Sequence, residues 1–197
     1  MTDKKRRILN AATILFAEMG FKDTSIAELA RLTDSAQGTI FYHFKNKATL
    51  LVNVLDDVKQ GILSEFEAFT QDHKFNTGRE MVESVIAFLL YLASQKEQWI
   101  LLLHRLFPYE FARKDADCRD HLEAIFNTFI DLFEEGILRG QEDGSIQNLH
   151  PRKTSLVLFS MVNGLIWLKF HDLYDSTSLH KELLAACRKI ISGDQRQ

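Results

Sequence analysis

The short stretch from Gln37 to Lys47 combines side chains that suit contact with nucleic acid. Gln37 can pair with the N6 and N7 edge of adenine, and Thr39 can place its methyl group against that of thymine. Tyr42, His43 and Lys47 can donate hydrogen bonds to phosphate oxygens. The stretch therefore predicts base readout at one end and backbone contact at the other. An exposed helix with ordinary polar residues is the alternative.

The face pattern of residues 36–44 supports this division. On a helix, Ile40, Phe41 and Phe44 fall on one side, and we expect them in the core. Gly38 falls on the other side, among polar neighbours, where a small residue lets a helix press into a major groove.

Two further helices must position this one. Residues 4–19 have helical apolar spacing and end at Gly20, a residue that readily adopts the left-handed conformation. Ser25 and Glu28 have capping-box spacing and open a second helix. Asp34 tolerates the left-handed conformation in the turn that follows. We expect eight residues of this unit to contact DNA: Thr24, Ser25, Gln37, Gly38, Thr39, Tyr42, His43 and Lys47.

The composition indicates an all-α fold. The chain of 197 residues has nine Gly and two Pro, and no stretch alternates apolar and polar residues as a half-buried strand does. We expect about nine helices, arranged as a helix-turn-helix domain over residues 1–48 and a helical ligand-binding and dimerisation domain over residues 49–197. Within the second, Pro108 is expected to stop a helix, residues 109–118 to form a loop, and Gly140 to end the helix of residues 119–139.

Charge is unevenly distributed between these parts. Residues 1–50 carry eight Lys/Arg and five Asp/Glu, a net charge of +3, whereas the remainder carries −6. A basic head on an acidic body suits a head that meets phosphates, although many charge clusters are only solvated faces.

The body holds a large supply of aromatic side chains, with 15 Phe in the whole chain. Such residues can line a pocket for a hydrophobic small molecule, although at helical spacing they are more often plain core. The candidate pocket residues are Phe88, Tyr91, Trp99, Phe107, Phe126, Phe129, Phe133 and Trp167.

The last two predicted helices suit self-association. Ser160, Gly164 and Trp167 share one face, and small residues four apart let two helices approach closely. With Leu183 and Cys187 on the last helix, two copies would form a four-helix interface. Two internal core helices of a monomer are the alternative.

The head resembles the TetR family of bacterial transcriptional regulators. The matching residues are Thr24–Ala27, Leu29-Ala30, Gly38–Lys47 and Leu50. The resemblance implies a homodimer that binds a pseudo-palindromic double-stranded DNA operator, usually represses, and is released by a small molecule bound in the body. The chain departs from the family pattern in the turn, where Thr33-Asp34 replaces Ala-Gly and Ser35 becomes the candidate helix cap.

Other classes of function have little support in the residues. No Ser/His/Asp set, P-loop or Gly-rich cradle is present, so neither enzymatic turnover nor a cofactor is expected. Cys118 and His121 lack a third metal ligand, so no metal site is expected. The segment 155–170 is too short to span a bilayer. Two cysteines without a disulfide framework suit a reducing cytoplasm. A helical protein-interaction adaptor that binds no operator remains the alternative function.

Overall fold

The computed structural model describes residues 3–71, 74–171 and 176–192. These residues form ten α-helices and one short 3₁₀-helix, η1, with no strand among them. The all-α prediction is therefore confirmed. The chain divides into two compact units, Met1–Glu65 with Lys96–Ile125, and Phe66–Gln95 with Phe126–Gln197. The predicted boundary between residues 48 and 49 separates two functions, whereas these units are separated by their internal contacts. The functional boundary therefore stays a prediction.

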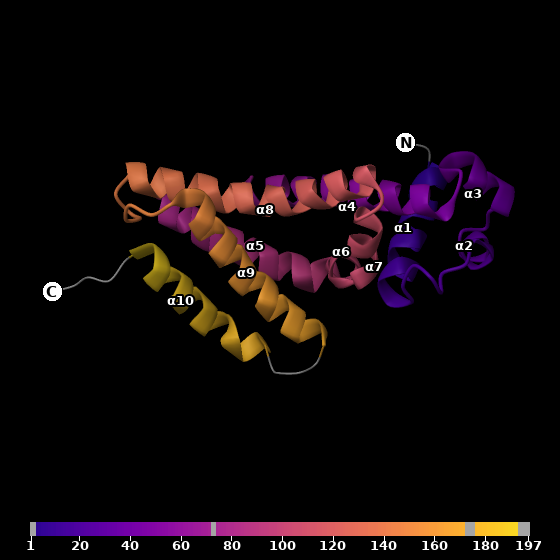
Figure 1. Cartoon of the computed structure of the whole chain (residues 1–197). Coiled ribbons are helices and arrows are strands. Elements are labelled where there is room, and N and C mark those ends of the chain that lie inside the picture. Colours follow the sequence, from indigo (N-terminus) through magenta and orange to yellow (C-terminus); the bar gives the residue numbers. More distant parts are fainter. Residues whose placement is uncertain (1–2, 72–73, 172–175, 193–197) are drawn as a thin grey trace. The chain divides into compact units, whose positions relative to one another are not determined.

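The first unit contains the N-terminal helices and the short helices that follow residue 96. Its helices, two of which extend into the second unit's sequence, are α1 (Asp3–Glu18), α2 (Ile26–Leu32), α3 (Gln37–Phe44), α4 (Lys47–Thr70), α6 (Glu97–His104), α7 (Leu106–Ala112) and the start of α8 (Ala116–Glu142). Figure 1 shows α1, α2 and α3 grouped at one end of this unit. Their shared core includes Ile8, Phe16 and Leu29, which are at most 1% exposed.

The second unit is built on long helices with wide apolar faces. It comprises the end of α4, α5 (Gly78–Gln95), most of α8, α9 (Pro151–Phe170), η1 (Ser176–Leu179) and α10 (His180–Ser192). α9 and α10 run side by side in Figure 1. Thr77 and Glu80 cap α5 as their spacing suggests. The N–H of Glu80 donates to the Thr77 hydroxyl at 3.2 Å, and the N–H of Asn76 donates to the Glu80 carboxylate at 2.8 Å.

Two predicted helix ends are wrong. The chain breaks at Arg105, which is extended, and Pro108 lies inside the first turn of α7, where its missing N–H costs no hydrogen bond. Residues 109–112 are therefore helical, and α8 begins at Ala116, so the predicted loop over 109–118 shrinks to a short turn. The break also accounts for ten α-helices where about nine were expected.

Gly140 does not end α8, which continues to Glu142. Gly140 is instead a close-approach residue, because a Cβ atom there would lie 2.5 Å from Cγ1 of Ile146. Gly78 has the same role on α5, since its Cβ would lie 2.0 Å from the backbone nitrogen of Gly140.

Candidate nucleic-acid interface

The turn between α2 and α3 sets the direction of the predicted recognition helix. Ser25 accepts a hydrogen bond from the N–H of Glu28 at 3.0 Å and so begins α2 as expected. At the other end Asp34 has a φ of 46°, the left-handed conformation predicted for it. The N–H of Ser35 then reaches back to the carbonyl of Ala30 at 2.9 Å. This pattern of a left-handed residue and a six-residue return bond ends a helix sharply.

Ser35 does not cap α3, contrary to the expectation. The N-cap is Ala36, which offers no side-chain acceptor, while the Ser35 hydroxyl donates to the carbonyl of Thr33 at 3.2 Å. The first N–H groups of α3 therefore lack a side-chain cap. Such a helix end favours negative charge through its backbone donors and its dipole.

α3 presents a broad exposed face. Ile40 and Phe44 are each 1% exposed and anchor the helix, as predicted. Phe41 is 44% exposed, so its predicted place in the core is wrong, since it lies toward the outer edge of the apolar side. Tyr42 is 84% exposed, and a Cβ atom added to Gly38 would meet nothing within 4 Å.

The remaining residues predicted to contact DNA differ in how accessible they are. Gln37 is exposed, whereas Thr39 and His43 are half-buried. The ring of His43 packs edge-on against Tyr42 with centroids 5.3 Å apart. Thr24 is 1% exposed, and its hydroxyl donates to the carbonyl of Gly20 at 2.8 Å. The Thr24 side chain thus stabilises the loop before α2. Its contact with DNA stays a prediction, as do those of the other residues.

Lys47 is half-buried, and its ammonium group is held by backbone carbonyls of the head. Its Nζ donates to the carbonyls of Phe21, Lys22 and Thr24 at 2.6, 3.3 and 2.8 Å, and lies 4.5 Å from the centre of the Phe21 ring. Three carbonyl acceptors use the three N–H donors of an ammonium group. Burial lowers the pKa of Lys47 from its ordinary value, and the charge of Asp23 partly opposes this.

The junction between α3 and α4 is a tight turn. Lys45 has a φ of 54° and a ψ of −50°, and the N–H of Asn46 donates to the carbonyl of Phe44 at 2.5 Å. This is a γ-turn, in which the central residue adopts a sparsely populated conformation. The Asn46 side chain then accepts from the N–H of Thr49 at 2.8 Å and begins α4.

Two arginines whose contacts the sequence did not predict also fix the head. Arg7 on α1 donates to the carbonyl of Thr33 at 2.8 Å and so ties α1 to the turn before α3. Arg105 donates through its Nε to the carbonyl of Ala17 and through a terminal nitrogen to that of Glu18, both at 2.6 Å. These bonds satisfy carbonyls at the C-terminal end of α1. No local sequence pattern marks either arginine.

The aromatic residues proposed for a ligand pocket do not gather at one place. Trp99 and Phe107 belong to the first unit, where Phe107 stacks on Phe21 with centroids 3.8 Å apart. In the second unit, Phe88 and Phe133 are fully buried. The others of this unit are Tyr91, Phe126, Phe129 and Trp167, of which Phe126 and Phe129 both pack on Phe159.

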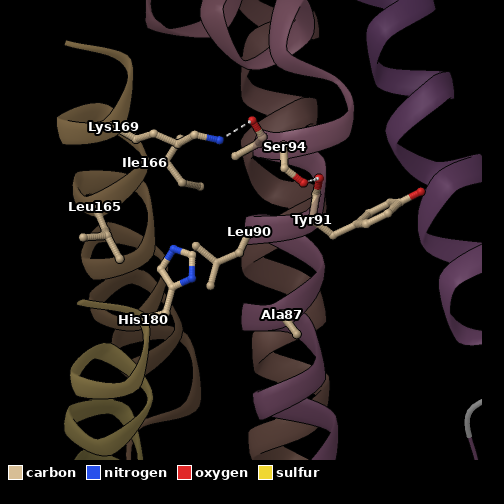
Figure 2. A pocket seen from close by; sticks show the side chains of 9 residues that line it. Ala87, Leu90, Tyr91, Ser94, Leu165, Ile166, Lys169 and His180 are labelled. Atoms are coloured by element: carbon tan, nitrogen blue, oxygen red, sulfur yellow. Dashed lines mark hydrogen bonds between the residues drawn. The ribbon is translucent and has the colours of Figure 1, made fainter. Parts of the chain in front are cut away.

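A cavity of about 360 Å³ does occur in the second unit, and among the eight candidates Tyr91 alone contributes to its described lining. Figure 2 shows it between α5, α9 and the start of α10, with Lys169 and His180 at its edge. The ring of Tyr91 points away from it, toward Phe69, whose centroid is 6.0 Å away.

The residues predicted for a dimer interface fall into two groups. Ser160, Gly164 and Trp167 are exposed on α9, and a Cβ atom at Gly164 would meet nothing within 4 Å. Leu183 and Cys187 on α10 are 8% and 1% exposed and lie in the core of the second unit.

Metal and membrane sites find no support in the described residues. Among residues 3–71, 74–171 and 176–192, no three His, Cys, Asp or Glu side chains come together as a metal site would require. No helix in those ranges is long and apolar enough to cross a membrane.

The exposed helix α3, which follows α2 after the tight turn at Asp34, gives the chain the geometry of a helix-turn-helix protein. A family model described as "Bacterial regulatory proteins, tetR family" matches residues 8–54, which include α1, α2 and α3. This match identifies residues 8–54 as a DNA-binding domain of the kind found in TetR-family transcriptional regulators.

Individual relatives agree with this assignment. The chain is 27% identical to the HTH-type transcriptional regulator QacR of Staphylococcus aureus over 169 residues, which cover 82% of this chain and 84% of that protein.

Solved structures share the fold along almost the whole chain. One is a transcriptional regulator from Saccharomonospora viridis in complex with choline, with a TM-score of 0.84 and 18% identity over 98% of this chain and 100% of that one. Another is the regulator FadR from Bacillus subtilis in complex with stearoyl-CoA, with a TM-score of 0.73 and 20% identity over 94% and 98%.

Proposed function

We propose that this protein is a repressor that binds a pseudo-palindromic operator as a homodimer and releases it when a small molecule binds the body. The observation that carries the proposal is the exposed face of α3. Gly38 leaves open space on that face, Tyr42 is 84% exposed, and the helix is held from behind by Ile40 and Phe44. A helix that is anchored by buried side chains and exposes a glycine, polar residues and a tyrosine fits the geometry of a recognition helix in the major groove.

Dimerisation is supported by an exposed apolar surface on α9. Leu156, Val157 and Trp167 are 45%, 50% and 41% exposed, and they flank the small residues Ser160 and Gly164. An apolar strip of this kind on a helix suits burial against a second copy, with the small residues allowing close approach.

The buried residues of α10 would stabilise the unit that carries this interface without contacting the second copy. Leu183 and Cys187 fix α10 against its own unit, so the contacts across the dimer would come from the exposed side of α9. A two-fold arrangement would place both copies of α3 on one face of the duplex, with half-sites about one or more helical turns apart.

Release by a small molecule is supported by the cavity of about 360 Å³ in the second unit. The two structural neighbours described above were solved with choline and with stearoyl-CoA. The cavity is lined in part by α9, the helix that we assign to the dimer interface. A molecule bound there would shift α9, and a shift of α9 at the interface would change the spacing of the two heads.

A gel-shift assay with the DNA upstream of the protein's own coding region tests the proposal. We expect a sequence-specific complex that weakens steeply with salt, because lysine and arginine contacts to phosphate displace counterions. Binding that is equally tight to unrelated DNA would contradict operator recognition. No binding to this or any other DNA would favour the adaptor instead.

A further inference from the structure

The cavity beside α9 combines apolar walls with a basic edge. The residues that line it are Ala87, Leu90, Tyr91, Ala93, Ser94, Leu165, Ile166, Lys169 and His180. Its volume of about 360 Å³ lies at the small end of the range for ligand pockets. This volume favours a small ligand.

The inner walls of this cavity are hydrophobic. Ile166 and Leu165 are 3% and 8% exposed, and Ala93 is 2% exposed, so the floor belongs to the packed core of the unit. Leu90 reaches into the same space from α5 (Figure 2). These walls suit an alkyl chain or a ring and would bind it by removing apolar surface from water.

The edge of the cavity carries a held ammonium group. Nζ of Lys169 lies 3.3 Å from the carbonyl oxygen of Ala93, near the C-terminal end of α5 (Figure 2). The negative end of a helix dipole favours a cation there, which helps to keep the side chain at the cavity. One carbonyl accepts only one of the three ammonium protons, which leaves donors for a ligand.

The described lining of this cavity is basic rather than acidic. It includes Lys169 and His180 but no Asp or Glu. Within the part of the chain that the structure describes, Lys169 forms no ion pair with a carboxylate. A cationic ligand would meet the ammonium group of Lys169 without a compensating charge, whereas a carboxylate would gain a charge-assisted hydrogen bond.

From these observations we infer that the cavity between α5, α9 and α10 binds a small amphipathic carboxylate, with its carboxylate on Lys169 and His180 and its apolar body against Leu90, Leu165 and Ile166. The inference deepens the effector part of the proposed function, because it gives the chemical class of the molecule. It relies on that function only for the effect of binding on DNA.

Calorimetry on the protein without DNA tests the site, with octanoate, neutral octanamide and cationic octylammonium as probes. We expect octanoate to bind and octylammonium to bind at least about tenfold more weakly, because a charge-assisted hydrogen bond is replaced by repulsion. Lys169→Met should weaken octanoate about tenfold and leave octanamide unchanged. Lys169→Arg, which keeps the charge, should retain most of the octanoate affinity.

The matched control is Lys153→Met, which removes an exposed lysine from the same helix, α9. It should bind octanoate like the unmodified protein. Equal affinity for octanoate and octylammonium, an unchanged octanoate affinity in Lys169→Met, or no octanoate binding at millimolar concentration would each overturn the inference. Because the calorimetry is done without DNA, a negative result there would not contradict operator recognition. A negative gel shift, in turn, would not contradict a carboxylate site that calorimetry has measured.

Discussion

Replacing Lys47 by methionine should destabilise the first unit as well as weaken DNA binding. The substitution keeps a long apolar side chain but removes the ammonium group that donates to the carbonyls of Phe21 and Thr24 at 2.6 and 2.8 Å. It also removes the cation from the face of the Phe21 ring, 4.5 Å away.

The size of this effect follows from those contacts. Hydrogen bonds to a charged donor contribute about 1.5–3 kcal/mol each when shielded, and partial exposure of Lys47 reduces each to roughly 1 kcal/mol. The cation over an aromatic ring adds about 0.5 kcal/mol at such a site. We therefore expect the free energy of unfolding to fall by about 2 kcal/mol, which lowers Tm by about 4–8 °C in a chain of this size.

Denaturant unfolding followed by tryptophan fluorescence measures this change. A Trp167→Phe background leaves Trp99 as the reporter, and Trp99 belongs to the first unit with Lys47. Lys45→Met is the matched control, since Lys45 is an exposed lysine two residues away. Equal unfolding free energies for Lys47→Met and Lys45→Met would refute the structural role.

DNA affinity, measured well below the unfolding transition, tests the phosphate role of Lys47 separately. Its ammonium protons are used by carbonyls, so Lys47 would act on phosphates through its charge, and loss of that charge should weaken binding to all sequences alike. A loss confined to the operator would contradict that expectation.

Three further substitutions or measurements probe the same structure. Gly61→Ala should destabilise the first unit by about 1–3 kcal/mol, because a Cβ there would lie 2.3 Å from the ring of Trp99. Gly38→Ala should leave stability equal or raise it by up to about 1 kcal/mol through helix propensity, yet weaken operator binding about tenfold by crowding the groove. Burial raises the pKa of Cys118 and of Cys187 to about 11, so both thiols should stay protonated and react slowly with a thiol reagent at pH 8.

Their controls and contrary outcomes are specific. Gly61→Ala is compared with Gly38→Ala, a substitution in the same unit at a helical glycine with open space around it, and equal stability of the two would contradict the close packing. If Gly38→Ala leaves the operator affinity unchanged, this result would contradict the placement of α3 in the major groove. For the thiols, a raised folded pKa favours folding at pH values below about 9 and loses this contribution as pH rises toward about 11. Rapid labelling at pH 8 in folded protein would contradict their burial.

Local sequence signals predicted the head well. Gly20 and Asp34 adopt the left-handed conformations expected of them, Ser25 caps α2, and Ile40 and Phe44 are buried. Each of these features depends on a residue and its neighbours within a few positions, which is the range over which sequence patterns carry information.

The features that sequence reasoning missed depend on distant partners. Arg7 and Arg105 bind carbonyls 26 and 88 residues away, and no periodicity announces such bonds. The prediction that Gly140 ends a helix is wrong because the close approach of Ile146 cannot be inferred from a local pattern. The prediction that Pro108 stops a helix is wrong because a proline also fits the first turn of a helix.

The aromatic candidates show the same limit on a larger scale. Their helical spacing predicts that each side chain points into the protein, but core residues and pocket residues both point inward. Phe88 and Phe133 are fully buried, and only packing separates such residues from those that border a cavity. Lys169 and His180 border the cavity and carried no signal at all.

Selection of binding sequences from a random duplex library with the unmodified protein measures whether α3 reads DNA. We expect an enriched inverted repeat whose half-sites are about one or more helical turns apart, and loss of that enrichment with Gly38→Ala combined with Tyr42→Ala. Failure of any sequence to enrich, or equal enrichment by the double variant, would contradict DNA readout through α3.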